Sequence, residues 1–187
     1  MTIYSLVNES NKYFGLWPSD KSLFDPLYDL FLNCQSLSSA WIPLKCIWNI
    51  DYDDRRQKRI KVADFTRLAI SAPVFFPRGW AILKPLIGHE VEALSLETPI
   101  GPAFAINILG LIDALNHSAC ECSYYTDGKI MQVKKYMFLL DKVANVHIFR
   151  VPECYSTVFV TDTFKHLFEL HNLTGARFTR VWDSNVS

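Results

Sequence analysis

Hydrophobic and polar residues alternate along much of the chain in a way that predicts short strands separated by turns. Ile3 to Val7 alternate weakly and are expected to form a first strand. The aromatic and β-branched content around Trp41 to Ile50 favours a strand near Leu44 to Trp48. Val91 to Leu96 alternate, while Phe104 to Leu109 form the continuous apolar run typical of a buried strand.

A hairpin is predicted in the second half of the chain. Asp127-Gly128 lies between two β-like runs, Ser118 to Tyr125 and Lys129 to Leu139, and this dipeptide suits a type I′ turn. A second turn is expected at Glu97 to Pro102, where two prolines and a glycine cluster.

Prolines mark the expected helix boundaries in the first half. Asp25-Pro26 is an N-cap followed by proline at the first helical position, which predicts a helix from Pro26 to Asn33. Pro73 and Pro77 are expected to bracket a break, with Pro77 opening a helix that ends or kinks at Pro85.

The C-terminal region predicts a strand, strand, helix and strand in succession. A stop follows the helix at Asn172 to Gly175, where Gly175 is expected to adopt positive φ. The predicted elements are strands at 146–151 and 157–160, a helix capped by Thr161 or Asp162, and a strand at 176–182. The chain is therefore expected to be one α+β domain over residues 1–187, a mainly antiparallel sheet with a few short helices and a C-terminal β-β-α-β unit.

Composition is that of a folded protein without a strong charge preference. Half of the 187 residues are hydrophobic, and 19 basic residues balance 19 acidic ones, so neither disorder nor attraction to polyanions is expected. The longest apolar runs fall short of the roughly 18 residues that span a membrane, and the start is too polar for a signal peptide. We therefore predict a cytoplasmic protein whose five cysteines, an odd set, are reduced.

His117, Cys120 and Cys122 are of the types that bind zinc, but their spacing argues against a site. On a strand the two cysteines would face one side and the histidine the other, and a fourth ligand is missing. GxSxG, HExxH, GxxxxGK[ST] and GxGxxG motifs are also absent from the sequence. The sequence thus predicts no metal, no cofactor and no enzymatic activity.

A charge run from Asp51 to Lys61 is expected to be a solvated loop. No aromatic residue lies among its basic residues, Arg55 to Lys61, as a nucleic-acid platform would require, so nucleic acid is not expected as a partner. Charged loops can still steer protein partners. Together with a prolyl-aromatic stretch, the run supplies the predicted partner-binding residues: Asp51, Asp53, Asp54, Arg55, Arg56, Phe76, Arg78 and Trp80.

The second half resembles the MXAN-type immunity proteins of bacterial polymorphic-toxin systems, a family formerly catalogued as a domain of unknown function. The resemblance is carried by FAINILGLIDAL, KKYMF, HIFRV, VFVTDTFKHLFE and LTGARFTRVW, all within residues 103–187. Looser matches upstream include W-x-P at Trp41 to Pro43 and KVADF at Lys61 to Phe65. Asn116 stands where the family often carries an acid.

The resemblance implies an antidote that binds a cognate toxin and blocks it by steric and electrostatic complementarity, as half of an effector–immunity pair in bacterial competition. Two alternatives stay open. One is an enzyme of unrecognised type that reverses a toxin's modification of its target, and the other is a general protein-interaction module. Neither the toxin nor the oligomeric state follows from the sequence.

Overall fold

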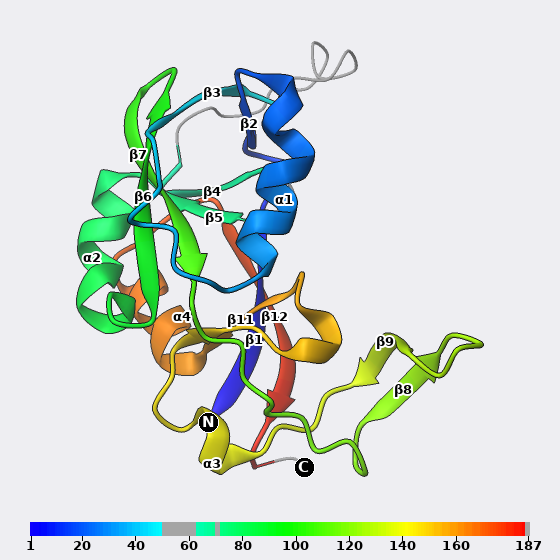
Figure 1. The fold of residues 1–187 in the computed structure, drawn as a ribbon. Coiled ribbons are helices and arrows are strands. Elements are labelled where there is room, and N and C mark those ends of the chain that lie inside the picture. The colour runs from blue at the N-terminus through cyan, green and yellow to red at the C-terminus, as the bar shows by residue number, and fades with distance from the viewer. Residues whose placement is uncertain (50–62, 70–71, 186–187) are drawn as a thin grey trace.

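The computed structural model describes residues 1–49, 63–69 and 72–185, and these residues form an α+β fold of mostly antiparallel strands, as predicted. Its strands make three groups: a closed barrel, a four-stranded sheet and a two-stranded hairpin that projects from the body (Figure 1). The charge run from Asp51 to Lys61 lies outside the described residues.

Six short strands close the barrel in the order β2-β3-β6-β7-β5-β4. Neighbours pair antiparallel except β2 with β4 and β3 with β6, which are parallel. Leu27 and Phe31 of α1 pack into the barrel core, which explains the apolar face of that helix. The strands are β2 Leu16–Pro18, β3 Leu44–Trp48, β4 Phe65–Leu68, β5 Ala72–Phe75, β6 Val91–Thr98 and β7 Gly101–Ile108.

The four-stranded sheet has the order β10-β11-β1-β12 and is antiparallel throughout. Alternation along β11 puts Val158 and Val160 in a core shared with the helices α2 and α4 and the barrel, whereas Phe159 faces a second core beside Phe149 and Trp182. The strands are β1 Thr2–Asn8, β10 Ile148–Phe149, β11 Val158–Thr161 and β12 Ala176–Asp183. The predicted C-terminal β-β-α-β unit is thus confirmed.

Helices cover the barrel and one face of the sheet (Figure 1). In the described ranges, the α-helices are α1 Phe24–Leu32, α2 Pro77–Ile87, α3 Leu140–Val143 and α4 Asp162–Leu170, and the 3₁₀ turns are η1 Lys21–Leu23 and η3 Pro152–Cys154. The helix opened by Pro77 continues past Pro85 to Ile87. No helix in the described part of the chain is long and apolar enough to cross a membrane.

Two predictions in the first half of the chain were wrong in detail. The predicted break between Pro73 and Pro77 is instead strand β5, in which Pro73 pairs with Arg67 of β4. Asp25 is not the predicted N-cap: helix α1 begins at Phe24 with Leu23 as its N-cap, so Asp25 and Pro26 lie within the first turn. Pro26 is tolerated there because the N–H groups of the first turn have no partner within the helix.

The predicted hairpin is present, formed by β8 Glu121–Tyr124 and β9 Ile130–Lys135, but its turn differs. Gly128 alone of the loop residues has positive φ, at +83°, and its N–H donates to the carbonyl of Tyr125. That pattern is a type I turn followed by a left-handed glycine, a three-residue loop in place of type I′.

Two carboxylates on or beside β6 fasten distant segments to the barrel. Glu90 is buried and accepts the backbone N–H groups of His147 and Ile148 at 2.8–2.9 Å, which holds β10 in place. Glu92 fixes the loop after α1 and also accepts from Asn107 of β7.

The pKa of Glu92 reflects these bonds. Burial alone would raise it, but the N–H of Leu37 and the side chains of Ser36 and Asn107 outweigh burial and lower the pKa to about 2.

Candidate functional site

The structure describes three of the eight predicted partner-binding residues: Phe76, Arg78 and Trp80, at the start of α2. Phe76 is buried in the barrel core, and Trp80 is half-buried against Phe104 with ring centroids 6.1 Å apart. Asp51, Asp53, Asp54, Arg55 and Arg56 lie outside the described residues. The assignment of these eight residues to a contact surface stays a prediction.

Arg78 has a clear intramolecular role. Its Nη1 lies 2.9 Å from both carboxylate oxygens of Asp64, and its Nη2 donates to the carbonyl of His171 at 2.7 Å. Asp64 in turn accepts the N–H and the hydroxyl of Thr174 at 2.9 and 3.0 Å. This Asp64 clamp ties the start of α2 to the turn between α4 and β12.

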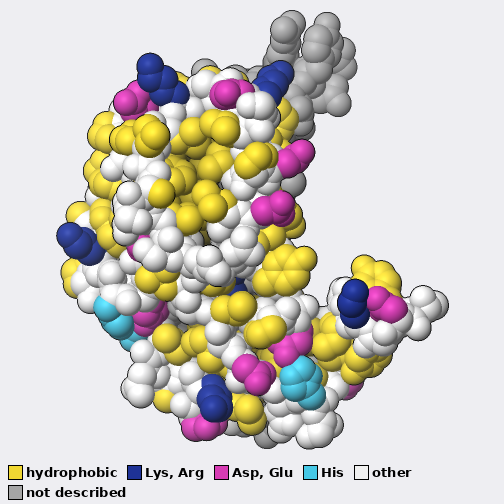
Figure 2. All heavy atoms as spheres, viewed as in Figure 1, with side chains coloured by type: hydrophobic (Ala, Val, Ile, Leu, Met, Phe, Trp, Pro, Cys, Tyr) yellow, Lys and Arg dark blue, Asp and Glu magenta, His cyan; other side chains and the backbone are white. Residues whose placement is uncertain are grey.

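The hairpin β8–β9, here called the arm, projects from the body as a separate two-stranded sheet (Figures 1 and 2). Val133 and Cys122 pack into the second sheet core at its root. Beyond the root, Tyr124, Tyr125 and Met131 are each more than half exposed. An isolated hairpin with exposed aromatic residues buries little surface of its own, so the arm offers apolar area to a partner.

A groove of about 580 Å³ lies on the body between α1 and η3. Tyr28 and Leu32 of α1 line one side, and Leu111, Pro152 and Tyr155 line the other. The side chains of Leu111 and Tyr155 are 46% and 51% exposed, so they offer apolar contacts to a partner. Figure 2 shows hydrophobic side chains along the side of the body that faces the arm.

The α1 side of this groove is acidic. Asp29 lines the groove and Asp25 lies one turn earlier, and both are exposed. Neither Asp25 nor Asp29 forms an ion pair with another of the residues that the structure describes. Apolar walls with an exposed acidic edge suit a protein partner that presents basic side chains.

Beneath the groove, the guanidinium of Arg150 is fully buried. Its Nη1 donates to the carbonyl of Tyr155, which fixes the backbone from which the Tyr155 ring projects. Burial lowers the pKa of Arg150, and the proximity of Cys34 and Tyr28 opposes that shift. Arg150, which belongs to the family-like segment HIFRV, is therefore part of the support for the groove.

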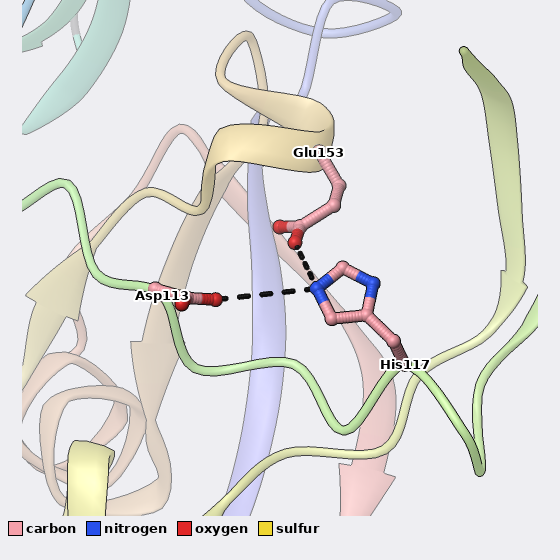
Figure 3. A group of neighbouring side chains, drawn as sticks. All are labelled: Asp113, His117 and Glu153. Carbon is pink, nitrogen blue, oxygen red and sulfur yellow. Dashed lines mark ion pairs between the residues drawn. The ribbon is translucent and has the colours of Figure 1, made fainter. Parts of the chain in front are cut away.

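Beside the groove, a histidine and two carboxylates converge at the root of the arm. Nε2 of His117 lies 2.8 Å from Oε1 of Glu153 and 4.0 Å from Oδ1 of Asp113 (Figure 3). Of the residues proposed for and then rejected as a zinc site, only His117 belongs to this cluster.

Partial burial disfavours loss of the thiol proton at two cysteines near the arm, Cys120 and Cys154. Burial raises the pKa of Cys120 and raises that of Cys154 to about 11. A thiol is a poor nucleophile until it loses its proton, so these side chains serve as packing material.

Some of this surface was within reach of sequence reasoning. Tyr124 and Tyr125 directly precede the predicted hairpin turn, and a hairpin tip is exposed by its position. The groove had no such signal, because Tyr28, Leu111 and Tyr155 come from three segments that only the tertiary fold brings together.

A known family model matches part of the chain. Residues 95–183 match a family model described as "Immunity protein family (Imm11)". The matched stretch includes the arm, η3, the cluster of His117 with two carboxylates and most of the four-stranded sheet. Comparison with curated proteins finds no match. The match confirms the predicted resemblance to an immunity protein family over this part of the chain.

Proposed function

We propose, from the immunity-family match over residues 95–183, that this chain is an immunity protein that binds a cognate bacterial toxin and holds it inactive. We further propose that residues 1–187 form a single domain and that the protein acts in the cytoplasm. The cell would compete with its neighbours through a polymorphic-toxin system. Neutralisation then needs a surface that covers the toxin and no chemical reaction.

We place the toxin-contact surface on the arm and the groove because both expose aromatic side chains. Tyr124, Tyr125 and Tyr155 are 59%, 57% and 51% exposed. Tyrosine is enriched among residues that dominate binding energy, because it offers a large, rigid and amphipathic contact. The acidic residues Asp25 and Asp29 would add steering of a basic toxin surface.

The direct test is co-expression with the toxin encoded beside the gene, followed by affinity measurements on the purified pair. Restored growth and co-purification are expected. Tyr155→Ala, or the double change Tyr124→Ala and Tyr125→Ala, should weaken binding by more than about 30-fold, the effect of losing an interface residue worth about 2 kcal/mol.

Matched controls remove exposed apolar area elsewhere. Ile42 and Leu170 are 81% and 61% exposed, and their change to alanine should leave binding within about twofold. Equal losses from tyrosine and control variants would reject the arm and groove as the contact surface. Failure of the unaltered chain to bind or to restore growth would reject the immunity function itself.

Two alternatives make different predictions. A general interaction module would bind proteins without protecting cells from the toxin. An enzyme that reverses a toxin's modification would protect without a stable complex. The cluster of Asp113, His117 and Glu153 is the place to look for such chemistry, but the first two side chains are 82% and 58% exposed, whereas catalytic electrostatics gain most in a water-excluded site.

A further inference from the structure

We propose that Asp113, His117 and Glu153 form a binding site for one divalent transition-metal ion, and that Zn²⁺ is the ion that fits best. The inference is independent of the proposed toxin partner. It goes beyond the family match, which assigns no ligand to these residues.

The geometry of the three side chains suits a metal ion. One ligand atom from each lies within 4.8 Å of the other two, and Figure 3 shows the two carboxylates pointing toward Nε2 of His117. Around an ion with bonds of about 2.0–2.2 Å, neighbouring ligand atoms lie about 3–3.5 Å apart. The observed 2.8 and 4.0 Å separations from Nε2 bracket that value, and the 82% exposed Asp113 side chain is free to adjust.

A buried carboxylate oxygen of Glu153 is a second, independent argument that a cation binds here. The side chain of Glu153 is only 8% exposed, and its Oε1 contacts His117. Its Oε2 is buried and has no hydrogen-bond partner among the described residues. A buried charged oxygen without a partner is costly, and coordination of a cation would satisfy it.

Charge balance points the same way. Two carboxylates face one imidazole, so the cluster keeps an excess negative charge even when His117 is protonated. A divalent cation bound by two carboxylates and a neutral imidazole would bring the cluster to neutrality. An imidazole ligand favours first-row transition ions over Mg²⁺ and Ca²⁺. Among them we choose Zn²⁺, because it binds histidine nitrogen and Asp or Glu oxygen and its filled d shell imposes no geometry of its own on an irregular set of three ligands.

Both segments that carry the ligands are held by buried neighbours. Ala114 and Leu115 are buried, and backbone bonds from Asn116 and Leu139 fix the segment that presents Asp113 and His117. On the other side, the backbone of η3 positions Glu153 between Pro152 and Cys154. A bound ion would therefore join η3 to the segment that leads into the arm, and would restrain the arm at its root.

The experiment uses the full-length chain stripped with a chelator. Titration with Co²⁺ followed by visible absorption, and with Zn²⁺ by calorimetry, should give saturable binding of one ion per chain, while Mg²⁺ and Ca²⁺ should give none. Zn²⁺ at about 100 times its Kd should raise the midpoint of thermal unfolding by roughly 5–10 °C. Zn²⁺ should also slow proteolytic cleavage of the arm.

Variants locate the ligands. His117→Ala, Glu153→Gln and Asp113→Asn should each weaken Zn²⁺ binding by more than about tenfold, because even an outer-shell partner is worth about 10–100-fold. Because the Asp113 side chain is exposed, we expect the Asp113→Asn variant to fold even where the His117 or Glu153 variant does not. The matched control is His89→Ala, since His89 also contacts a glutamate, Glu90, at 3.5 Å but belongs to no group of three ligands within the described part of the chain.

The proposal is overturned by any of three results. One is the absence of saturable Zn²⁺ or Co²⁺ binding to the unaltered chain. Another is binding that the Asp113 variant leaves unchanged. The third is binding that shows the intense near-ultraviolet bands of cobalt bound to thiolate, which would move the site to Cys120 and Cys122.

Discussion

Replacing Asp64 by alanine is expected to destabilise the fold far more than replacing its ion-pair partner Arg78. The two residues form one ion pair, yet their surroundings differ. The side chain of Asp64 is 11% exposed, whereas that of Arg78 is 56% exposed. Loss of Asp64 leaves the N–H and hydroxyl of Thr174 without their acceptor, while loss of Arg78 leaves a carboxylate that still has two other donors.

The magnitudes follow from these contacts. A backbone N–H bonded to a carboxylate contributes about 1.5–3 kcal/mol, and a hydroxyl about 1 kcal/mol. A half-exposed ion pair adds about 0–1 kcal/mol. We therefore expect Asp64→Ala to lower the free energy of unfolding by about 3 kcal/mol and Arg78→Ala by about 1 kcal/mol.

Urea denaturation at pH 7, monitored by tryptophan fluorescence, measures both changes. Lys129→Ala is the control, because Lys129 lies 3.3 Å from Asp127 in an exposed pair and its loss should cost less than about 0.5 kcal/mol. A cost for Arg78→Ala equal to or above that for Asp64→Ala would refute this reasoning. Weaker toxin binding by Arg78→Ala at unchanged stability would instead support the predicted contact role of Arg78.

Three further predictions concern the support of the fold. Gly175 has φ +98°, and a Cβ there would lie 2.0 Å from the carbonyl oxygen of Phe65, so Gly175→Ala should lower the free energy of unfolding in urea by more than about 3 kcal/mol. Gly101 has φ +112° but lies in open space, so Gly101→Ala should cost only about 1–2 kcal/mol. Equal costs would contradict the steric argument. Glu90→Ala should cost about 3 kcal/mol, because it removes the acceptor of two backbone N–H groups at β10, and a loss below 1 kcal/mol would contradict this. The folded-state pKa of Glu92 is lowered to about 2 from an ordinary value near 4.3, so its contribution to folding stability is present above about pH 4.3 and is lost as pH falls toward 2. Glu92→Gln should therefore flatten the plot of stability against pH in that range, and an unchanged plot would contradict the role given to the Glu92 bonds.

Local signals predicted the elements that are long or well punctuated. Leu44–Trp48 was placed correctly because aromatic and β-branched residues cluster there, and the terminal unit because its helix and turns carry their own stop signals. Strands β2, β4 and β5 were missed. Each has only three or four residues, too few for a clear periodic pattern, and β2 and β5 also pair with strands about 30 or more residues away in the sequence, β3 and β7.

The same distinction applies to the candidate site. The arm was predicted from Asp127-Gly128 and the β-like runs on either side of it, and tyrosines next to a hairpin turn are expected to be exposed. The grouping of His117 with Asp113 and Glu153 could not, since Glu153 is 36 residues further along and reaches the histidine only through the packing of η3. The cysteine neighbours that first drew attention to His117 proved to be packing residues.

Stoichiometry of toxin inhibition is the measurement that tests neutralisation by binding most directly. The purified chain would be titrated into a fixed amount of the toxin encoded beside its gene while toxin activity is followed. Binding predicts that activity falls linearly and is abolished at about one chain per toxin, with a complex that survives gel filtration. Protection by far less than one equivalent would show turnover, and undiminished toxin activity at excess chain would show that this protein is not the antidote.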